Sequence, residues 1–168
     1  MYAIHELQGL DYLLKTITKE QSYALYQRNL KLVVELNNSY WYGDFVEMEN
    51  EFVKQLYIDH LGDVDIEYQH PIKYGTTLLK KVFETFRTTL EEMPKSQFDY
   101  NPFHNLDNLP LLFETIVKVL NKANITDVST SLRPYMLNAH KIDSKQSLPF
   151  INLKDERINL VSIIDITD

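Results

Sequence analysis

The side chains best suited to chemistry in this sequence are carboxylates, and most of the unbalanced ones lie in one stretch. From Glu35 to Glu67 the chain carries nine acidic residues and a single basic one, Lys54, which gives a local charge of −8. The whole chain of 168 residues has a formal charge of −7, so the remainder is close to neutral. Clustered carboxylates repel one another and attract cationic partners, so the stretch predicts a recognition surface for a basic molecule.

Aromatic residues accompany these acids, beginning with a Tyr-Trp-Tyr run at 40–42 that contains the only tryptophan. Tyrosine and tryptophan are the residues that most often anchor protein interfaces. We therefore expect a partner-binding face formed by Trp41, Tyr42, Asp44, Glu47, Glu51, Asp63 and Asp65. The alternative interpretation is a solvated acidic face packed against the basic residues of a helix at 77–92.

Metal and cofactor chemistry find little support in the sequence. The alternation of Asp63, Asp65 and Glu67 resembles the opening of a calcium loop, but Tyr68 and Tyr74 stand where that loop needs glycine and glutamate. The five histidines are scattered, and none of the four glycines lies within twelve residues of another. We expect no metal, no cofactor and no glycine-rich phosphate loop. The acidic balance also argues against direct binding of nucleic acid.

The composition predicts a protein that is neither secreted nor embedded in a membrane. The chain has no cysteine, which fits a reducing compartment. Its beginning lacks the basic and apolar regions of a signal peptide, and no apolar run approaches the roughly 20 residues of a membrane helix. We expect a cytoplasmic protein in which residues 1–168 form a single domain.

Nucleophilic and acid-base catalysis are not predicted from most of the chain. There is no Gly-x-Ser-x-Gly motif, and carboxylate pairs such as Glu47 and Glu51 fall on a helix face predicted to be exposed. One segment differs. Arg133 and His140, in the sequence RPYMLNAH, are seven positions apart and would share a face of a helix.

This pair resembles the Arg-x4–6-His motif of HEPN ribonucleases, which are small all-helical domains. The resemblance covers eight residues, and Pro134 replaces the polar residue that usually follows the arginine. It implies a dimeric ribonuclease in which His140 performs acid-base chemistry and Arg133 stabilises phosphate charge. The alternative is an arginine in the first turn of a helix and a histidine in its last.

Apolar periodicity predicts helices over most of the chain. Residues 4–17 have apolar side chains at spacings of three and four, and a second helix is expected from a capping box at Thr18 to the turn at 37–39. A third is expected from Asp44 to Gly62, a fourth over 77–92, and a sixth over 131–140. The fifth, at about 109–122, is the most apolar and is predicted to be central.

The predicted fold class is therefore mainly α, with five to six helices around the helix at 109–122. A small β element is expected at 63–74, where apolar and acidic residues alternate. Residues 148–166 are predicted as a C-terminal β-hairpin, with an amphipathic helix as the alternative.

Three functional hypotheses follow. The first is a non-enzymatic inhibitor of the immunity or antitoxin type, whose acidic, aromatic face blocks a basic toxin or nucleic-acid-acting enzyme. Such a protein would be a monomer or part of a one-to-one heterodimer. The second is the HEPN-like ribonuclease that uses Arg133 and His140. The third is a helical scaffold or regulatory subunit whose acidic face is only solvated.

Overall fold

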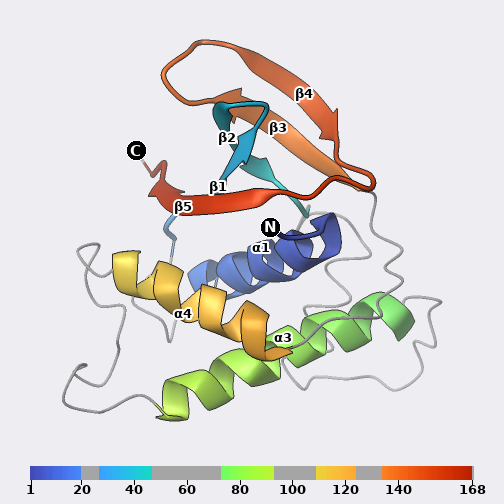
Figure 1. Cartoon of the computed structure of the whole chain (residues 1–168). Coiled ribbons are helices and arrows are strands. Elements are labelled where there is room, and N and C mark those ends of the chain that lie inside the picture. Colours follow the sequence, from blue (N-terminus) through green and yellow to red (C-terminus); the bar gives the residue numbers. More distant parts are fainter. Residues whose placement is uncertain (20–26, 47–72, 93–108, 124–133, 168) are drawn as a thin grey trace.

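A computed structural model describes residues 1–19, 27–46, 73–92, 109–123 and 134–167. Within these residues the chain forms three helices and one five-stranded antiparallel sheet (Figure 1). The helices are α1 (Ile4–Lys19), α3 (Lys73–Glu92) and α4 (Leu109–Ala123). The strands are β1 (Leu30–Leu36), β2 (Ser39–Asp44), β3 (Tyr135–Lys141), β4 (Ser147–Asn152) and β5 (Asn159–Asp165).

The strands are arranged in the order β4-β3-β2-β1-β5, and every neighbouring pair is antiparallel. Strands β1 and β2 form a tight hairpin through Asn37 and Asn38, whose φ angles are 49° and 62°. Asparagine tolerates this left-handed conformation better than most residues, and two such residues in succession match the twist of a two-residue hairpin. The turn therefore fixes the register in which Glu35 lies opposite Tyr40.

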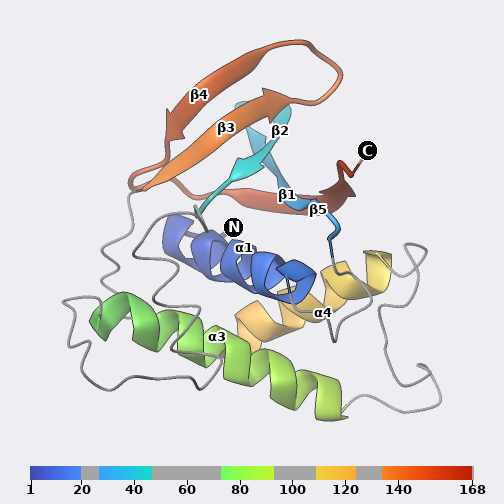
Figure 2. The same cartoon turned by 180° about the vertical axis from the view of Figure 1, so that it is seen from behind.

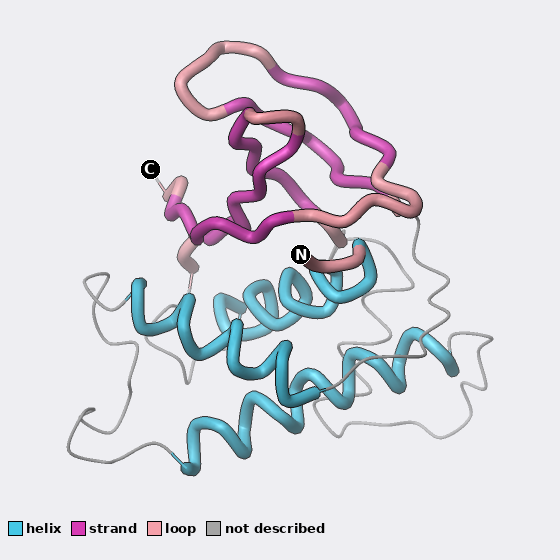
Figure 3. Tube along the Cα trace, in the orientation of Figure 1, coloured by secondary structure: helices cyan, strands magenta, loops and turns pink. Residues whose placement is uncertain are grey.

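All three helices lie on the same side of the sheet (Figures 1 and 2). Helix α1 packs against β1 and α4 packs against β5, while α3 packs against α1 and α4 on the side away from the strands. The separation of the strands from the helices is also plain in the tube view (Figure 3). The fold thus consists of a sheet, two helices beneath it and a third helix beneath those.

The core lies between the sheet and the helices, with α1 at its centre and side chains of α3 and α4 completing it. The apolar stripe of α1 is fully buried, and alternate residues of β1 (Leu30, Leu32 and Val34) face it within the same cluster. Of the residues on the other face, Lys31 and Glu35 are half-buried, while Val33 is buried but does not belong to the core cluster. This alternation is what a strand with one face on the core produces.

Three of the predicted helices are confirmed. The helix expected at 4–17 is α1, that at 77–92 is contained in α3, and that at 109–122 coincides with α4. In each, the apolar side chains recur at helical spacing over a long window, which is the most dependable signal in a sequence.

The mainly α fold class is wrong, because the described residues contain a five-stranded sheet as well as helices. The last part of the second predicted helix is strand β1. The described part of the helix predicted at 131–140 belongs to strand β3. The third was expected to begin at Asp44, but Asp44 is the last residue of β2. Short apolar runs such as LKLVVEL satisfy both helical and strand periods, and here pairing with neighbouring strands decided the outcome.

The C-terminal segment forms strands, as one of the two alternatives predicted, but not a hairpin. Strand β4 pairs with β3, whereas β5 pairs with β1 at the opposite edge of the sheet. The β element predicted at 63–74 lies largely outside the described residues, and its last two positions, Lys73 and Tyr74, begin α3. Most of the helix predicted at 44–62 also lies outside them.

Candidate functional site

A buried carboxylate on α1 holds the chain where it leaves β2. Asp11 is completely buried, and its Oδ2 accepts the backbone N–H groups of Phe45 at 2.7 Å and Val46 at 3.0 Å. The same oxygen accepts a hydrogen bond from Lys15 Nζ at 2.5 Å. Strand β2 ends at Asp44, so the N–H groups of Phe45 and Val46 have no partner in the sheet. The carboxylate of Asp11 serves as their charged acceptor.

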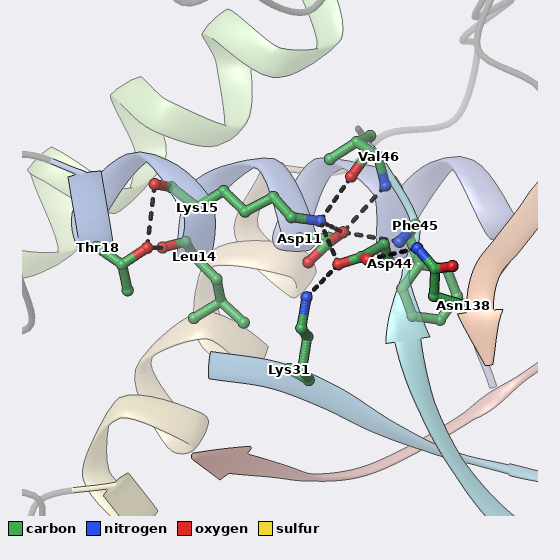
Figure 4. A network of polar contacts seen from close by, with 9 residues as sticks. All are labelled: Asp11, Leu14, Lys15, Thr18, Lys31, Asp44, Phe45, Val46 and Asn138. Carbon is green, nitrogen blue, oxygen red and sulfur yellow. Dashed lines mark hydrogen bonds and ion pairs between the residues drawn. The ribbon is translucent and has the colours of Figure 1, made fainter. Parts of the chain in front are cut away.

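Two lysines converge on this corner from different elements (Figure 4). Lys15 also donates to the backbone carbonyl of Val46 at 2.6 Å, and its Nζ lies 3.1 Å from Oδ1 of Asp44. Lys31, from β1, binds the same Asp44 oxygen. Asp11, Lys15, Lys31 and Asp44 thus form one network of two acids and two bases, which we call the anchor network.

The charges of the anchor network stabilise one another. Burial alone would raise the pKa of Asp44, but the charge of Lys15 and the contacts from Lys31 outweigh burial and hold that pKa below its ordinary value. Burial alone would lower the pKa of Lys15, but the carboxylates of Asp11 and Asp44 raise it above its ordinary value. Both groups are therefore ionised at neutral pH, and neither is poised to exchange protons with a substrate.

The anchor network therefore has a structural role. Its formal charges cancel, and its lysines already bind the carboxylates that might otherwise hold a cation. Within the described parts of the chain, no group of three or more histidine, aspartate or glutamate side chains is arranged to bind a metal ion. What the network does is to fix Phe45 and Val46, the two residues immediately before the acidic positions 47–67.

A second group of side chains lies on the face of the sheet opposite the core. Val34 and Trp41 are cross-strand partners that belong to the core cluster, so the adjacent pair Val33 and Tyr42 points to the other face. Tyr42 is in turn paired with His140 of β3, and their rings stack with centroids 5.2 Å apart. We call this side of the sheet the open face.

Further aromatic side chains lie at two other places on the sheet. Tyr40 lies opposite Glu35, on the same face as Tyr42, and 47% of its surface is exposed. On the outer strands Phe150 is 54% exposed and contacts the ring of Tyr135 at a centroid distance of 5.4 Å. Exposed aromatic side chains are frequent on surfaces that bind other molecules.

The residues predicted to bind a partner do not lie on one common face of the structure. Trp41 is only 8% exposed and belongs to the core, so its side chain is not available for contact. Tyr42 is half-buried on the open face, and Asp44 belongs to the anchor network. The remaining predicted contacts, Glu47, Glu51, Asp63 and Asp65, lie outside the described residues.

The geometric basis of the HEPN resemblance does not hold. His140 lies on strand β3, where positions seven apart do not share a helical face, and its ring stacks on Tyr42. Arg133 lies outside the described residues. The all-helical architecture that the resemblance implies is also incompatible with the sheet.

Sequence reasoning missed the anchor network. Asp11 and Lys15 have the i, i+4 spacing of a helical ion pair, and Asp11 interrupts an otherwise apolar run, which was an available signal of a buried charge. Asp44 is predicted instead as the first residue of a helix and as a partner contact. Lys31 could not be assigned, because its position beside Asp44 depends on the pairing of β1 with β2.

Among the described helices, none combines the length and the apolar character needed to cross a bilayer. Comparison of the chain with protein-family models, with curated proteins and with solved structures found no match to any of them.

Proposed function

We propose that this protein is a non-enzymatic binding protein of the immunity or antitoxin type, which inhibits a basic partner through an acidic, aromatic-rich surface. The partner is a toxin or another enzyme whose cationic site acts on nucleic acid. Carboxylates of the inhibitor would occupy the positions that phosphates occupy in the substrate. Such complexes form quickly, because complementary charge steers the encounter.

The observation that carries this proposal is the separation of charge within the chain. Positions 47–67 contain seven acidic residues and one basic residue, a net charge of −6. The rest of the chain contains seventeen acidic and sixteen basic residues, a net charge of −1. The acidity is therefore concentrated rather than spread evenly for solubility.

The anchor network supports the same interpretation. A segment rich in like charges gains no stability from its own repulsions, so the framework has to hold it where it begins. Asp11 and Lys15 do this by binding the backbone of Phe45 and Val46 from α1. The buried ion pairs thus fix the point from which the acidic segment continues.

The proposal is tested by capturing partners of the tagged protein from its native lysate at low and at high salt, followed by native mass spectrometry. Four proteins are compared. They are the wild type, the variant Glu47→Lys with Glu51→Lys, the control variant Glu114→Lys with Glu156→Lys, and an unrelated acidic protein of similar size. The control variant has the same change in charge, but Glu114 and Glu156 are exposed residues outside the acidic stretch, on α4 and just before β5.

We expect the wild type and the control to capture the same basic protein in a one-to-one complex, and the first variant to lose it. High salt should weaken that complex. The captured protein should then lose its activity on nucleic acid when the wild type is added. A protein that remains alone or forms only homodimers at both salt concentrations contradicts the proposal. Equal capture by both charge variants would instead assign the acidic stretch a merely solvating role, as in a scaffold.

A further inference from the structure

One carboxylate on the open face, that of Glu35, has no counterion among the residues that the structure describes. Glu35 is half-buried on β1, yet it makes no ion pair and no side-chain hydrogen bond with any residue that the structure describes. Lys31 is the basic residue that shares its strand and its face, but the ammonium group of Lys31 is bound to Asp44. A partly desolvated carboxylate gains most from a partner that brings its own positive charge.

Two tyrosines of β2 share the face of this carboxylate, one opposite it and one diagonal to it. Tyr40 is the direct cross-strand partner of Glu35, and Tyr42, two residues further along β2, lies on the same face. The Tyr40 side chain is exposed, and the Tyr42 ring is held in place by stacking on His140. The hairpin turn at Asn37 and Asn38 keeps these positions in register.

We propose that Glu35, Tyr40 and Tyr42 form a receptor for an arginine side chain of the basic protein partner. This inference rests on the proposed function and adds the chemistry of the contact. A guanidinium group is planar, so it stacks on a tyrosine face while it donates two parallel hydrogen bonds to one carboxylate. An ammonium group fits less well, since it is more strongly hydrated and has no planar face to stack.

The charges around the receptor favour this occupant. Asp44, the acid that β2 carries, is neutralised by Lys15 and Lys31, so Glu35 on β1 is the carboxylate of these two strands that no described cation binds. The receptor and the acidic positions 47–67 would act on the same basic partner. The first would select arginine by shape, and the second would provide long-range attraction.

The probes for this inference are hexa-arginine and hexa-lysine peptides, which carry equal charge. Binding is measured by calorimetry, and the ring proton signals of Tyr40 and Tyr42 are followed by NMR. The variants are Glu35→Gln, which keeps the size of the side chain, and Tyr40→Leu. Glu114→Gln serves as the matched control, because Glu114 is exposed on α4.

We expect hexa-arginine to bind more tightly than hexa-lysine and to shift both tyrosine signals. Glu35→Gln should weaken the arginine peptide about tenfold, the effect of losing one charge-assisted contact, while the control leaves it unchanged. Equal affinity for the two peptides, or tyrosine signals that do not move, would overturn the inference. So would Glu35→Gln behaving like the control.

The two proposals fail in different ways. If Glu47→Lys with Glu51→Lys abolishes peptide binding while Glu35→Gln has no effect, the arginine receptor is wrong and the acidic-surface proposal stands. If arginine binding depends on Glu35 and Tyr40 but no basic protein is captured from the lysate, the receptor stands and the inhibitor function is wrong.

Discussion

Oδ2 of Asp11 accepts the backbone N–H of Phe45 at 2.7 Å across 34 residues of sequence. This one contact joins the first helix to the end of the second strand, and Lys15 reinforces it by binding the next carbonyl, that of Val46. The acidic positions 47–67 therefore follow directly on two residues that buried, charged hydrogen bonds hold in place.

Replacing Asp11 by alanine should be strongly destabilising. The change leaves the N–H groups of Phe45 and Val46 without their acceptor and removes one of the two carboxylates that neutralise Lys15. Breaking a buried pair in this way costs about 3–5 kcal/mol, so the free energy of unfolding in urea should fall by that amount. Glu92→Ala, which removes an exposed pair with Lys122, should cost no more than about 1 kcal/mol. Similar losses for the two variants would contradict the assigned role of Asp11.

The anchor network should make stability depend on pH at both extremes. The pKa of Asp44 is lower in the folded than in the unfolded chain, so its contribution is present above about pH 4 and is lost as the pH falls through the folded pKa. The pKa of Lys15 is raised, so its contribution is present below about pH 10.5 and is lost as the pH rises through the folded pKa. Urea unfolding of the wild type and of Asp44→Asn at a series of pH values checks the acidic side. The difference in unfolding free energy between the wild type and Asp44→Asn should be constant near neutrality and should shrink well below pH 4. A difference that persists well below pH 4 would show that the ionisation of Asp44 does not cause the loss of stability in acid.

Gly43 should not tolerate a side chain. It lies where the pairing of β2 with β3 shifts in register, and opposite it Asn138 has a positive φ of 50°. A Cβ at Gly43 would stand 2.7 Å from the carbonyl oxygen of Leu137 and 3.0 Å from a side-chain atom of Met136. Because backbone cannot move aside cheaply, Gly43→Ala should cost about 1–3 kcal/mol of unfolding free energy.

Gly9→Ala provides the comparison for Gly43→Ala. Its Cβ would meet only the side chain of Val82 on α3, at 3.1 Å, and alanine favours the helix that contains it by about 1 kcal/mol. The Gly9 variant should therefore lose clearly less stability than the Gly43 variant. The reverse order would contradict the close approach of β3 to β2 at Gly43.

The β1–β2 turn offers a stabilising change. Asn37 and Asn38 both have positive φ angles, and glycine is preferred at the second position of such a turn. Asn38→Gly should raise the free energy of unfolding by about 0.5 kcal/mol, whereas Asn38→Val should lower it by more than that. Thermal unfolding of the two variants tests the turn, and a stabilising valine would be incompatible with a left-handed residue at this position.

The sequence allowed the long helices to be predicted and concealed the sheet. In α1, α3 and α4 the apolar residues follow one period over three turns or more, so local pattern and final structure agree. Residues 30–36 and 135–141 are seven residues each and support either structure. They are strands because β2 lies between them and bonds to both, which is a relationship that no local window contains.

The site was predictable only in part. The acidic and aromatic composition of the stretch was plain, but the exposure of each aromatic residue depends on the face to which it points. Trp41 and Tyr42 are adjacent, yet one belongs to the core and the other to the open face. That division requires the strand assignment, because alternation between faces is a property of strands and not of helices.

If the carboxylates at positions 47–67 attract a basic partner, the rate of association with the captured protein depends on them. Rates are measured by stopped flow at several ionic strengths for the wild type, for Glu47→Lys with Glu51→Lys, and for Glu114→Lys with Glu156→Lys. We expect Glu47→Lys with Glu51→Lys to associate at least about tenfold more slowly than the wild type and to lose most of the salt dependence, while Glu114→Lys with Glu156→Lys keeps both. Equal rates and equal salt dependence for the two variants would show that the carboxylates at positions 47–67 do not attract the partner.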